Sequence, residues 1–434
     1  MTKILPSTGW LEAKLEQVLR LSTGKLDANA AVTGGDYPFF TCAEQALRID
    51  SYAFDTDAIL LAGNGSFSVK RYSGKFNAYQ RTYVLEPRNI ELNYLYWAIR
   101  ENITAITSSE RGSTIPYIRK GDILEVSIAI PPLAEQQVIA EKLDLLIAEV
   151  ETIKTSLENT LETLKRFRQS VLNAATSGKL TESWRESILP QWQDVKLIDV
   201  LESKPRNGKS PKGVDYETPY RNLTLSSTTT GRFVENQYKF VELDIDGDSY
   251  LWVKSGDILI QRANTIDYVG VSAIYEGEDN KYVYPDLIMK CRPNESALGK
   301  YLHLALSSEK VRKYFRDNAT GTSGNMPKIN QKVVSNAPIS LPTLAEQHEI
   351  VSRVERLFAG SDVTELQVNK ALERVKNLTR SILAKAFRGE LTEQWRKENP
   401  KLISGENSVE ALLEKIKNEQ AAAEPKRKTR KINA

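Results

Sequence analysis

Cysteine and histidine are scarce in this chain of 434 residues. Cys42 and Cys291 are its only cysteines, and His303 and His348 are its only histidines. None of these four stands at a metal-ligand spacing from another, so the sequence argues against a zinc site and predicts no bound metal. We expect each cysteine to be a small, buried, apolar residue of a protein in a reducing compartment.

Long apolar runs are also missing. No run approaches the ~18 residues that are needed to cross a bilayer. The segment Met1–Trp10 has one lysine and no apolar stretch, so it does not resemble a secretory signal. We therefore expect a cytoplasmic protein with no membrane contact.

Motifs for catalysis are absent as well. Gly208-Lys209-Ser210 resembles the end of a P-loop, but the first glycine of that motif would fall at Ser203. The sequence contains no G-x-S-x-G turn and no H-E-x-x-H motif. We find no catalytic constellation, and we predict a chain that is not an enzyme and that uses no cofactor.

Charge of one sign does not dominate, since 59 Lys and Arg residues face 56 Asp and Glu residues. A net charge of +3 excludes a strongly basic nucleic-acid coat, so anion binding must come from local clusters. The apolar share of 41% is that of a globular protein, and the length predicts two or three domains.

An internal repeat organises the chain. The stretch PPLAEQQVIAEKLDLL at 131–146 returns as PTLAEQHEIVSRVERL at 342–357, an offset of 211 residues. The offset holds to SGKLTESWR at 177–185 and RGELTEQWR at 388–396, and upstream Pro116 and Ile118 pair with Pro327 and Ile329. One large unit that occurs twice predicts a pseudo-twofold molecule.

The repeated segment has the apolar spacing of a long helix. From Ile139 to Val171, and again from Ile350 to Ile382, apolar residues recur at alternating steps of four and three with a few lapses. This narrow seam is typical of a coiled coil, and prolines before each helix and Gly178 and Gly389 after it mark the ends. The predicted helix–helix interface consists of Leu146, Leu157, Leu164, Leu357, Val368 and Val375. The alternative is that each helix packs on its own domain as a core element.

Two dissimilar stretches alternate with the helices, and both mix short β-rich runs with turns and helical pieces. The predicted fold class is α+β, with two mixed domains separated by two long antiparallel helices. The expected segments are 1–130 (first domain), 131–186 (first helix), 187–340 (second domain), 341–398 (second helix) and 399–434 (a polar and basic tail). Strands are expected at 57–61, 256–260 and 282–284, and helices at 92–100, 300–315 and 409–416.

Local basic clusters supply candidate phosphate-binding residues. Between Asp57 and Glu86 the chain has no acidic residue, and its cations are interleaved with aromatic and amide side chains, as nucleic-acid binding requires. The candidates in the first domain are Asn64, Lys70, Arg71, Lys75 and Arg81. Those in the second domain are Lys209, Arg262, Lys328 and Lys332. The competing interpretation of the first cluster is a pair of edge strands with a solvated basic face.

Glycine-rich turns provide a weaker signal. The stretch 320–325 aligns with 112–116, and its backbone N–H groups are suited to approach a phosphate. A plain turn explains these glycines equally well.

The two dissimilar domains and two repeated helices, each helix opened by proline-LAEQ and closed by G-x-L-T-x-x-W-R, resemble the specificity subunit of type I restriction-modification enzymes. The resemblance covers nearly the whole chain. It implies that each domain reads one half of a bipartite target in double-stranded DNA. It also implies that the helices space the halves and dock two DNA adenine methyltransferase (modification) subunits, with a restriction (translocase and nuclease) subunit joining further out.

Two other classes compete with this one. A non-DNA coiled-coil scaffold with two surface-binding domains needs no basic face, and a DNA-modifying enzyme needs its own active site. The missing catalytic motifs argue against the second class.

Overall fold

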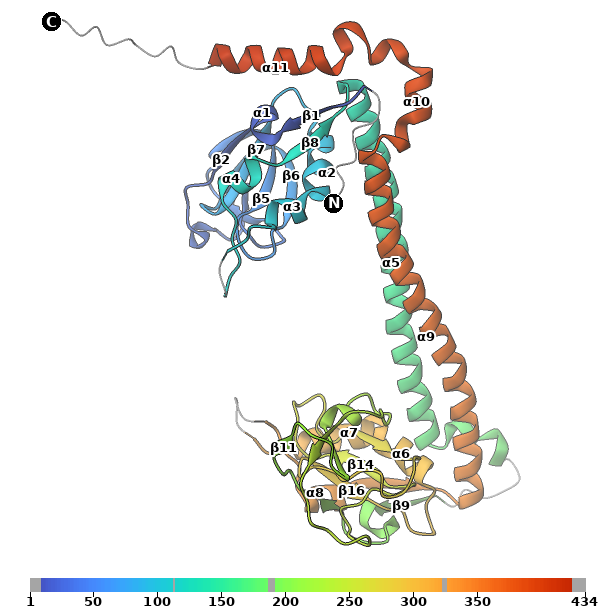
Figure 1. The fold of residues 1–434 in the computed structure, drawn as a ribbon. Coiled ribbons are helices and arrows are strands. Elements are labelled where there is room, and N and C mark those ends of the chain that lie inside the picture. The colour runs from blue at the N-terminus through green and yellow to red at the C-terminus, as the bar shows by residue number, and fades with distance from the viewer. Residues whose placement is uncertain (1–8, 112–113, 186–191, 322–325, 424–434) are drawn as a thin grey trace, which may run out of the picture. The chain divides into compact units, whose positions relative to one another are not determined.

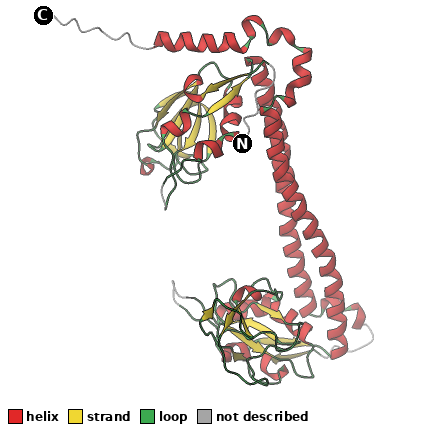
Figure 2. Ribbon diagram, in the orientation of Figure 1, coloured by secondary structure: helices red, strands yellow, loops and turns green. Residues whose placement is uncertain are grey.

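A computed structural model describes residues 9–111, 114–185, 192–321 and 326–423 (Figure 1). The chain divides into two compact units, one made of 1–156 with 371–434 and the other of 157–370. Each unit therefore combines one variable domain with the beginning of one long helix and the end of the other. In each unit the strands lie together, with helices and loops around them (Figure 2).

A six-stranded sheet forms the centre of the first unit, in the order β2-β7-β5-β6-β3-β4. Neighbouring strands are antiparallel except for β3 and β6. Ala58–Ala62 in β5 are buried, because Ile59 and Leu61 face one apolar cluster while Ala58 and Leu60 face another. The strands are β2 (Leu19–Thr23), β3 (Tyr37–Phe40), β4 (Leu47–Ile49), β5 (Phe54–Ala62), β6 (Val69–Ala78) and β7 (Thr82–Pro87).

Short helices and a second pair of strands complete this domain. The expected helix at 92–100 is confirmed as α2, whose first turn is capped by the Glu91 carboxylate accepting from Tyr94 N. Leu95 and Ala98 of α2 join the core of the unit. The remaining elements are α1 (Leu15–Val18), α2 (Leu92–Glu101), α3 (Ile103–Thr107), α4 (Lys120–Leu124) and the strand pair β1 (Leu11–Lys14) with β8 (Ser127–Ile130).

The second unit has three smaller sheets, with orders β10-β16-β14-β15, β11-β13-β12 and β17-β9. The strands are β9 (Gln193–Lys196), β10 (Arg206–Asn207), β11 (Gly213–Val214), β12 (Tyr220–Leu223), β13 (Tyr238–Val241), β14 (Ile258–Gln261), β15 (Ser272–Ile274), β16 (Ile288–Cys291) and β17 (Pro338–Leu341). The strand expected at 282–284 is wrong, since Val283 makes only isolated bridges. The helix expected at 300–315 is two helices, α6 (Gly299–Ser307) and α7 (Glu309–Asp317), because Ser308 has an extended backbone. A short helix, α8 (Gln331–Ser335), precedes β17.

The two long helices are α5 (Leu133–Thr176) and α9 (Leu344–Phe387). Each begins directly after the proline-containing segment, and each is followed by a glycine with positive φ, +79° at Gly178 and +75° at Gly389. These starts and C-terminal glycines confirm the predicted helix ends. Within the described residues, no helix is both long and apolar enough to cross a membrane.

The apolar residues near the helix ends pack into the domain cores as well as against the other helix. In the first unit, Ile139 and Leu143 of α5 share one cluster with Ile382 and Ala386 of α9 and with the domain. In the second unit, Val171 and Ala175 of α5 share a cluster with Ile350 and Val354 of α9. Near its ends, each long helix therefore packs both against the other helix, as in a coiled coil, and against a domain core.

The predicted seam is wrong at Leu357, whose side chain is 37% exposed, while the next residue, Phe358, packs at the core. A straight helix drifts by ~20° per heptad from a 3.5-residue repeat, so a strict seam does not stay on one face. Leu146 and Val375 are half-buried beside the first core. Leu157 and Leu164 are half-buried and Val368 is buried, and their mutual contact stays a prediction.

The C-terminal segment 399–434 was predicted to be a polar tail with a short helix at 409–416. That helix is confirmed as α11 (Val409–Ala423), and the short helix α10 (Glu393–Glu398) lies before the segment. Val409, Leu412 and Ile416 of α11 are buried in the core of the first unit. Their spacing of three and four residues gives one apolar face to an otherwise polar helix. The basic run 426–431 lies outside the described residues.

The Ile416→Ala variant is expected to lose about 2–4 kcal/mol of stability, because a buried branched side chain is removed and a cavity remains. Chemical denaturation of the full chain measures this loss. Lys417→Ala, at the next and exposed position, is the control that leaves stability unchanged. Equal stability of the two variants would show that α11 does not belong to the core.

The cysteines are both free thiols. Cys291 is buried as expected, whereas Cys42 is only half-buried and its Sγ donates to Arg81 O at 3.6 Å. Burial raises the pKa of the Cys291 thiol, which keeps it protonated and unreactive.

Candidate nucleic-acid interface

Two loops meet at one edge of the first domain. The first, Gly63–Ser68, follows the buried strand β5, and the second precedes α4. Ile118 N donates to Gly63 O at 3.0 Å, and Gly65 N donates to Pro116 O at 2.9 Å. Gly63 has no room for a side chain, since a Cβ would lie 2.6 Å from Arg81 O. These contacts hold Asn64 opposite Tyr117 in an isolated β-bridge.

The second domain repeats this loop pair. After β14, Ile329 N donates to Arg262 O at 2.9 Å, and Asn264 N donates to Pro327 O at 3.3 Å. Lys328 pairs with Ala263 as Tyr117 pairs with Asn64. The sequence match of Pro116 and Ile118 with Pro327 and Ile329 therefore marks one structural feature that occurs in both domains.

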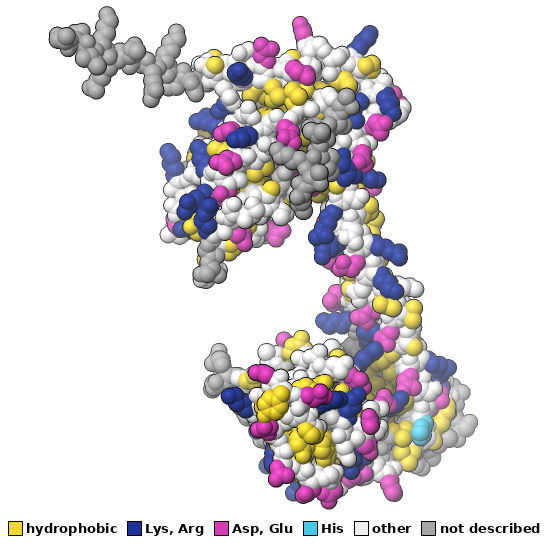
Figure 3. Space-filling model, in the orientation of Figure 1, with side chains coloured by type: hydrophobic (Ala, Val, Ile, Leu, Met, Phe, Trp, Pro, Cys, Tyr) yellow, Lys and Arg dark blue, Asp and Glu magenta, His cyan; other side chains and the backbone are white. Residues whose placement is uncertain are grey.

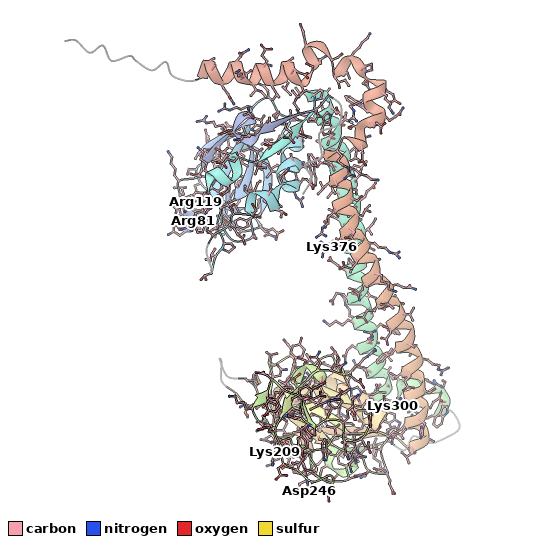
Figure 4. The ribbon with its side chains drawn as sticks, viewed as in Figure 1. Arg81, Arg119, Lys209, Asp246, Lys300 and Lys376 are labelled. Carbon is pink, nitrogen blue, oxygen red and sulfur yellow. The ribbon has the colours of Figure 1, made fainter. Side chains whose placement is uncertain are left out.

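Exposed cations surround the loop pair of the first domain. Arg81 is exposed and lines a cavity of about 360 Å³ with Gly63, Gln80 and Tyr117. Arg119 is also exposed and lies at the same end of the domain as Arg81 (Figure 4). Sequence reasoning missed Arg119, although it directly follows the repeated Pro-x-Ile motif.

Asp122 fixes the second loop beside these cations. Its carboxylate accepts from Arg119 N at 2.7 Å and from Arg111 Nη1 at 2.9 Å. Burial by itself would raise the pKa of Asp122, but these bonds outweigh burial and lower that pKa. Asp122 therefore stays ionised and neutralises Arg111, while the Arg119 side chain remains exposed.

Two predicted candidates of the first domain have partners inside the first unit. Arg71 Nη1 donates to Asp144 Oδ1 at 2.9 Å, and its guanidinium lies over the Tyr96 ring. Lys70 Nζ donates to Ala43 O at 2.7 Å and to Ser68 Oγ at 2.8 Å. Burial lowers the pKa of Lys70. We therefore remove Arg71 and Lys70 from the proposed interface.

Lys75 is exposed, and its ammonium lies over the ring of Tyr52 at 4.7 Å from the centroid. This cation–π contact leaves the charge accessible. Lys75 stays a candidate. Asn64 is half-buried. Asn64 also remains a candidate, because its loop lies at the exposed edge of the domain.

In the second domain, Lys209, Lys328 and Lys332 are exposed. The structure brings their two segments together, since Gln331 Nε2 donates to Pro205 O. A cavity of about 430 Å³ at this junction is lined by Arg206 and Tyr250, and the Arg206 guanidinium lies over the Tyr250 ring. Arg262 is half-buried, and within the described residues its Nε has no hydrogen-bond partner.

The glycine-rich turns are described only in part. Gly112 and residues 322–325 lie outside the described residues. Over the visible face of each unit, Lys and Arg side chains are interspersed with Asp and Glu side chains (Figure 3). The described residues contain no group of three or more His, Cys, Asp or Glu side chains that could hold a metal ion.

The repeated motifs build a buried network in each unit. In the first, the Glu135 carboxylate is fully buried and accepts from Trp10 Nε1 at 2.9 Å, from Thr392 Oγ1 at 2.6 Å and from Arg396 Nη1. Arg396 also donates to Gly389 O at 2.8 Å. The Glu of LAEQ thus binds the Thr and Arg of T-x-x-W-R from the other copy of the repeat.

The second unit repeats the network. Glu346 accepts from Trp192 Nε1 at 3.0 Å, from Thr181 Oγ1 at 2.7 Å and from Arg185 Nη1 at 2.7 Å. A carboxylate buried this deeply needs charged and hydrogen-bonding partners, which explains why both motifs are repeated. Each network joins the residue before the first strand of its domain, Trp10 or Trp192, to the start of one long helix and to the segment that follows the other.

The neighbouring glutamine of each LAEQ motif fastens the helix start to the domain. Gln136 donates to Pro131 O at 2.8 Å and accepts from Glu91 N at 2.9 Å. Gln347 donates to Pro342 O at 2.9 Å and accepts from Leu298 N at 2.7 Å. These motifs therefore have a structural role and are distinct from the exposed cations described above.

The chain belongs to the family defined by the type I restriction modification DNA specificity domain, whose model matches residues 7–163 and 190–374. It is 45% identical to the type I restriction enzyme EcoDI specificity subunit of Escherichia coli, over 97% of this chain and 98% of that protein. It is 43% identical to the EcoKI specificity subunit of Escherichia coli strain K12, over 75% of this chain and 71% of that protein.

A solved structure shows the same fold. It comes from a study of complex assembly and conformational transition of the type I restriction-modification system. The TM-score is 0.65 at 16% identity, and the match covers 89% of this chain and 99% of that one. The family confirms that the chain is a specificity subunit, and the scaffold interpretation is not favoured.

Proposed function

We propose that each variable domain reads one half of a bipartite DNA target through its paired loops. The observation that carries this proposal is the same loop pair in both domains, with exposed cations beside it: Arg81 and Arg119 in one, and Lys328 and Lys332 in the other. Cations supply affinity for phosphates, and loop side chains such as Asn64 supply contacts to base edges. Lys75, Lys209 and Arg262 complete the proposed interface.

The long helices serve a second role in this proposal. They set the spacing between the two half-sites and dock two DNA adenine methyltransferase subunits, while a restriction subunit joins the complex further out. Exposed apolar residues on both helices support this role: Ile153 and Phe167 on α5 and Leu378 on α9. The chain acts in the cytoplasm, and the partner subunits carry out methylation and cleavage.

Replacing Arg81 and Arg119 together by alanine is expected to weaken binding of the full chain to all DNA sequences. Each lost phosphate contact reduces the slope of log affinity against log salt by about one. Fluorescence anisotropy at several salt concentrations measures both quantities. The Lys328 and Lys332 pair is tested in the same way.

Lys154→Ala together with Lys165→Ala is the matched control, since it removes two exposed cations from α5 and leaves the loops intact. The control is expected to bind like the parent chain. If both loop pairs also bind with unchanged affinity and salt slope, the interface lies elsewhere.

A further inference from the structure

The second unit contains a cavity of about 330 Å³ between α5, α6 and α9. Its wall is mainly apolar and includes Leu172, Leu304 and Phe358, and its rim carries Lys300 and Glu355. Lys300 lies beside the long helices in the second unit (Figure 4). Protein cavities that bind small molecules usually measure about 300–1,000 Å³, so this one suits a ligand of one or two rings.

The pseudo-twofold repeat shows what fills the same place in the first unit. Tyr94 of α2 donates its hydroxyl to Ala129 O, and Tyr301 of α6 donates its hydroxyl to Ser340 O. Ala129 and Ser340 are separated by the repeat offset of 211 residues. The two helices are therefore counterparts.

Trp97 lies three residues after Tyr94, and Leu304 lies three residues after Tyr301, so Leu304 is the counterpart of Trp97. The same offset of 211 residues makes Glu355 the counterpart of Asp144.

Trp97 occupies this place in the first unit. Its indole is 4% exposed, and Nε1 donates to Asp144 Oδ1 at 2.8 Å. In the second unit a leucine stands where the indole would lie, and Ser307 replaces the larger Arg100. The cavity is thus the space of a missing indole, with a carboxylate kept at the position that accepts the ring N–H.

The groups around the cavity suit a neutral ligand. Lys300 Nζ lies 2.7 Å from Glu355 Oε1 and 3.3 Å from Glu276 Oε1. Arg168 and Arg232, which also line the cavity, both pair with Asp362, so each cation of the lining already has a carboxylate partner. His303 Nε2 lies 3.1 Å from Ser272 O. Burial lowers the pKa of His303 and favours its neutral form. Glu355 is more than half exposed, so its carboxylate remains accessible to a further donor.

We propose that this cavity binds a small, neutral heteroaromatic molecule of indole size, with its ring N–H donating to Glu355. The ligand would occupy the second unit as Trp97 occupies the first. This site is separate from the loops of the proposed DNA interface, so its test does not depend on DNA binding.

Titration of the full chain with indole, followed by calorimetry and ligand-observed NMR, tests the proposal. Saturable binding is expected, and 1-methylindole, which lacks the N–H, is expected to bind about 2- to 10-fold more weakly. Leu304→Trp restores the first unit's indole and is expected to weaken indole binding by at least about tenfold, because the space is filled. Leu366→Trp places an indole at an exposed position of α9 and is expected to bind like the parent.

Ser307→Arg restores the counterpart of Arg100 at the rim and provides a second blocking variant should Leu304→Trp fail to fold. Circular dichroism establishes that each variant is folded. The proposal is overturned if the parent chain shows no saturable binding of indole. It is also overturned if a folded blocking variant binds indole as tightly as the parent does.

Discussion

Arg396→Ala is expected to lower the free energy of unfolding of the first unit by about 3–5 kcal/mol, because it leaves a buried carboxylate without its charged partner. Glu135 is fully buried, and the Arg396 side chain is mostly buried beside it. Trp10 and Thr392 still donate to the carboxylate in the variant, but neither carries a charge. Chemical denaturation, followed by circular dichroism, measures the loss.

Lys397→Ala is the matched control at the next position. Lys397 pairs with Glu393, and both side chains are more than half exposed. Such a surface pair contributes ~0–1 kcal/mol. If Arg396→Ala is no more destabilising than Lys397→Ala, the buried network does not hold the unit together. Arg185→Ala tests the equivalent network at Glu346 and is expected to behave like Arg396→Ala.

The long helices could be predicted from the sequence because their signals are local and repeated. Prolines precede Leu133 and Leu344, and glycines follow Thr176 and Phe387, so each end is marked within a few residues. The offset of 211 residues also located the paired loops through Pro116 and Pro327. What the repeat could not reveal is that Glu135 and Arg396 meet, since each comes from a different copy.

The roles of single cations could not be predicted, because they depend on distant partners. Arg71 belongs to a basic cluster in the sequence, but Asp144, its partner, lies 73 residues away. Lys70 is held by a backbone carbonyl, which a charge pattern does not show. The side chains of Arg81 and Lys328 are exposed instead, and exposure is set by the fold.

The C-terminal helix at 409–416 could be predicted, but its packing into the core of the first unit was missed for a different reason. Only three of its apolar residues, Val409, Leu412 and Ile416, reach the core, and charged residues surround them in the sequence. Composition therefore suggested a polar tail, whereas the spacing of these residues was the informative signal.

Inserting seven residues into each long helix, near Ser156 and Gln367, is expected to lengthen the spacer between the two half-sites of the DNA target. Seven residues are one heptad, so the insertion is expected to preserve the predicted helix–helix contact. They add ~10.5 Å at 1.5 Å per residue. Because DNA rises ~3.4 Å per base pair, the preferred spacer is expected to grow by about three base pairs. Selection of bound sequences from a random DNA pool measures it.

The spacer length and the half-site sequences of the selected DNA together test whether the helices set the distance between the half-sites. The half-site sequences are expected to stay unchanged, because the loops that we propose to read them are not altered. The longer spacer also rotates one half-site by about a third of a turn, so DNA twisting will lower the affinity. Insertions of three residues rotate the apolar face away from its partner helix and are expected to bind worse than insertions of seven. An unchanged spacer, or altered half-sites, in the seven-residue variant would show that the helices do not set the distance.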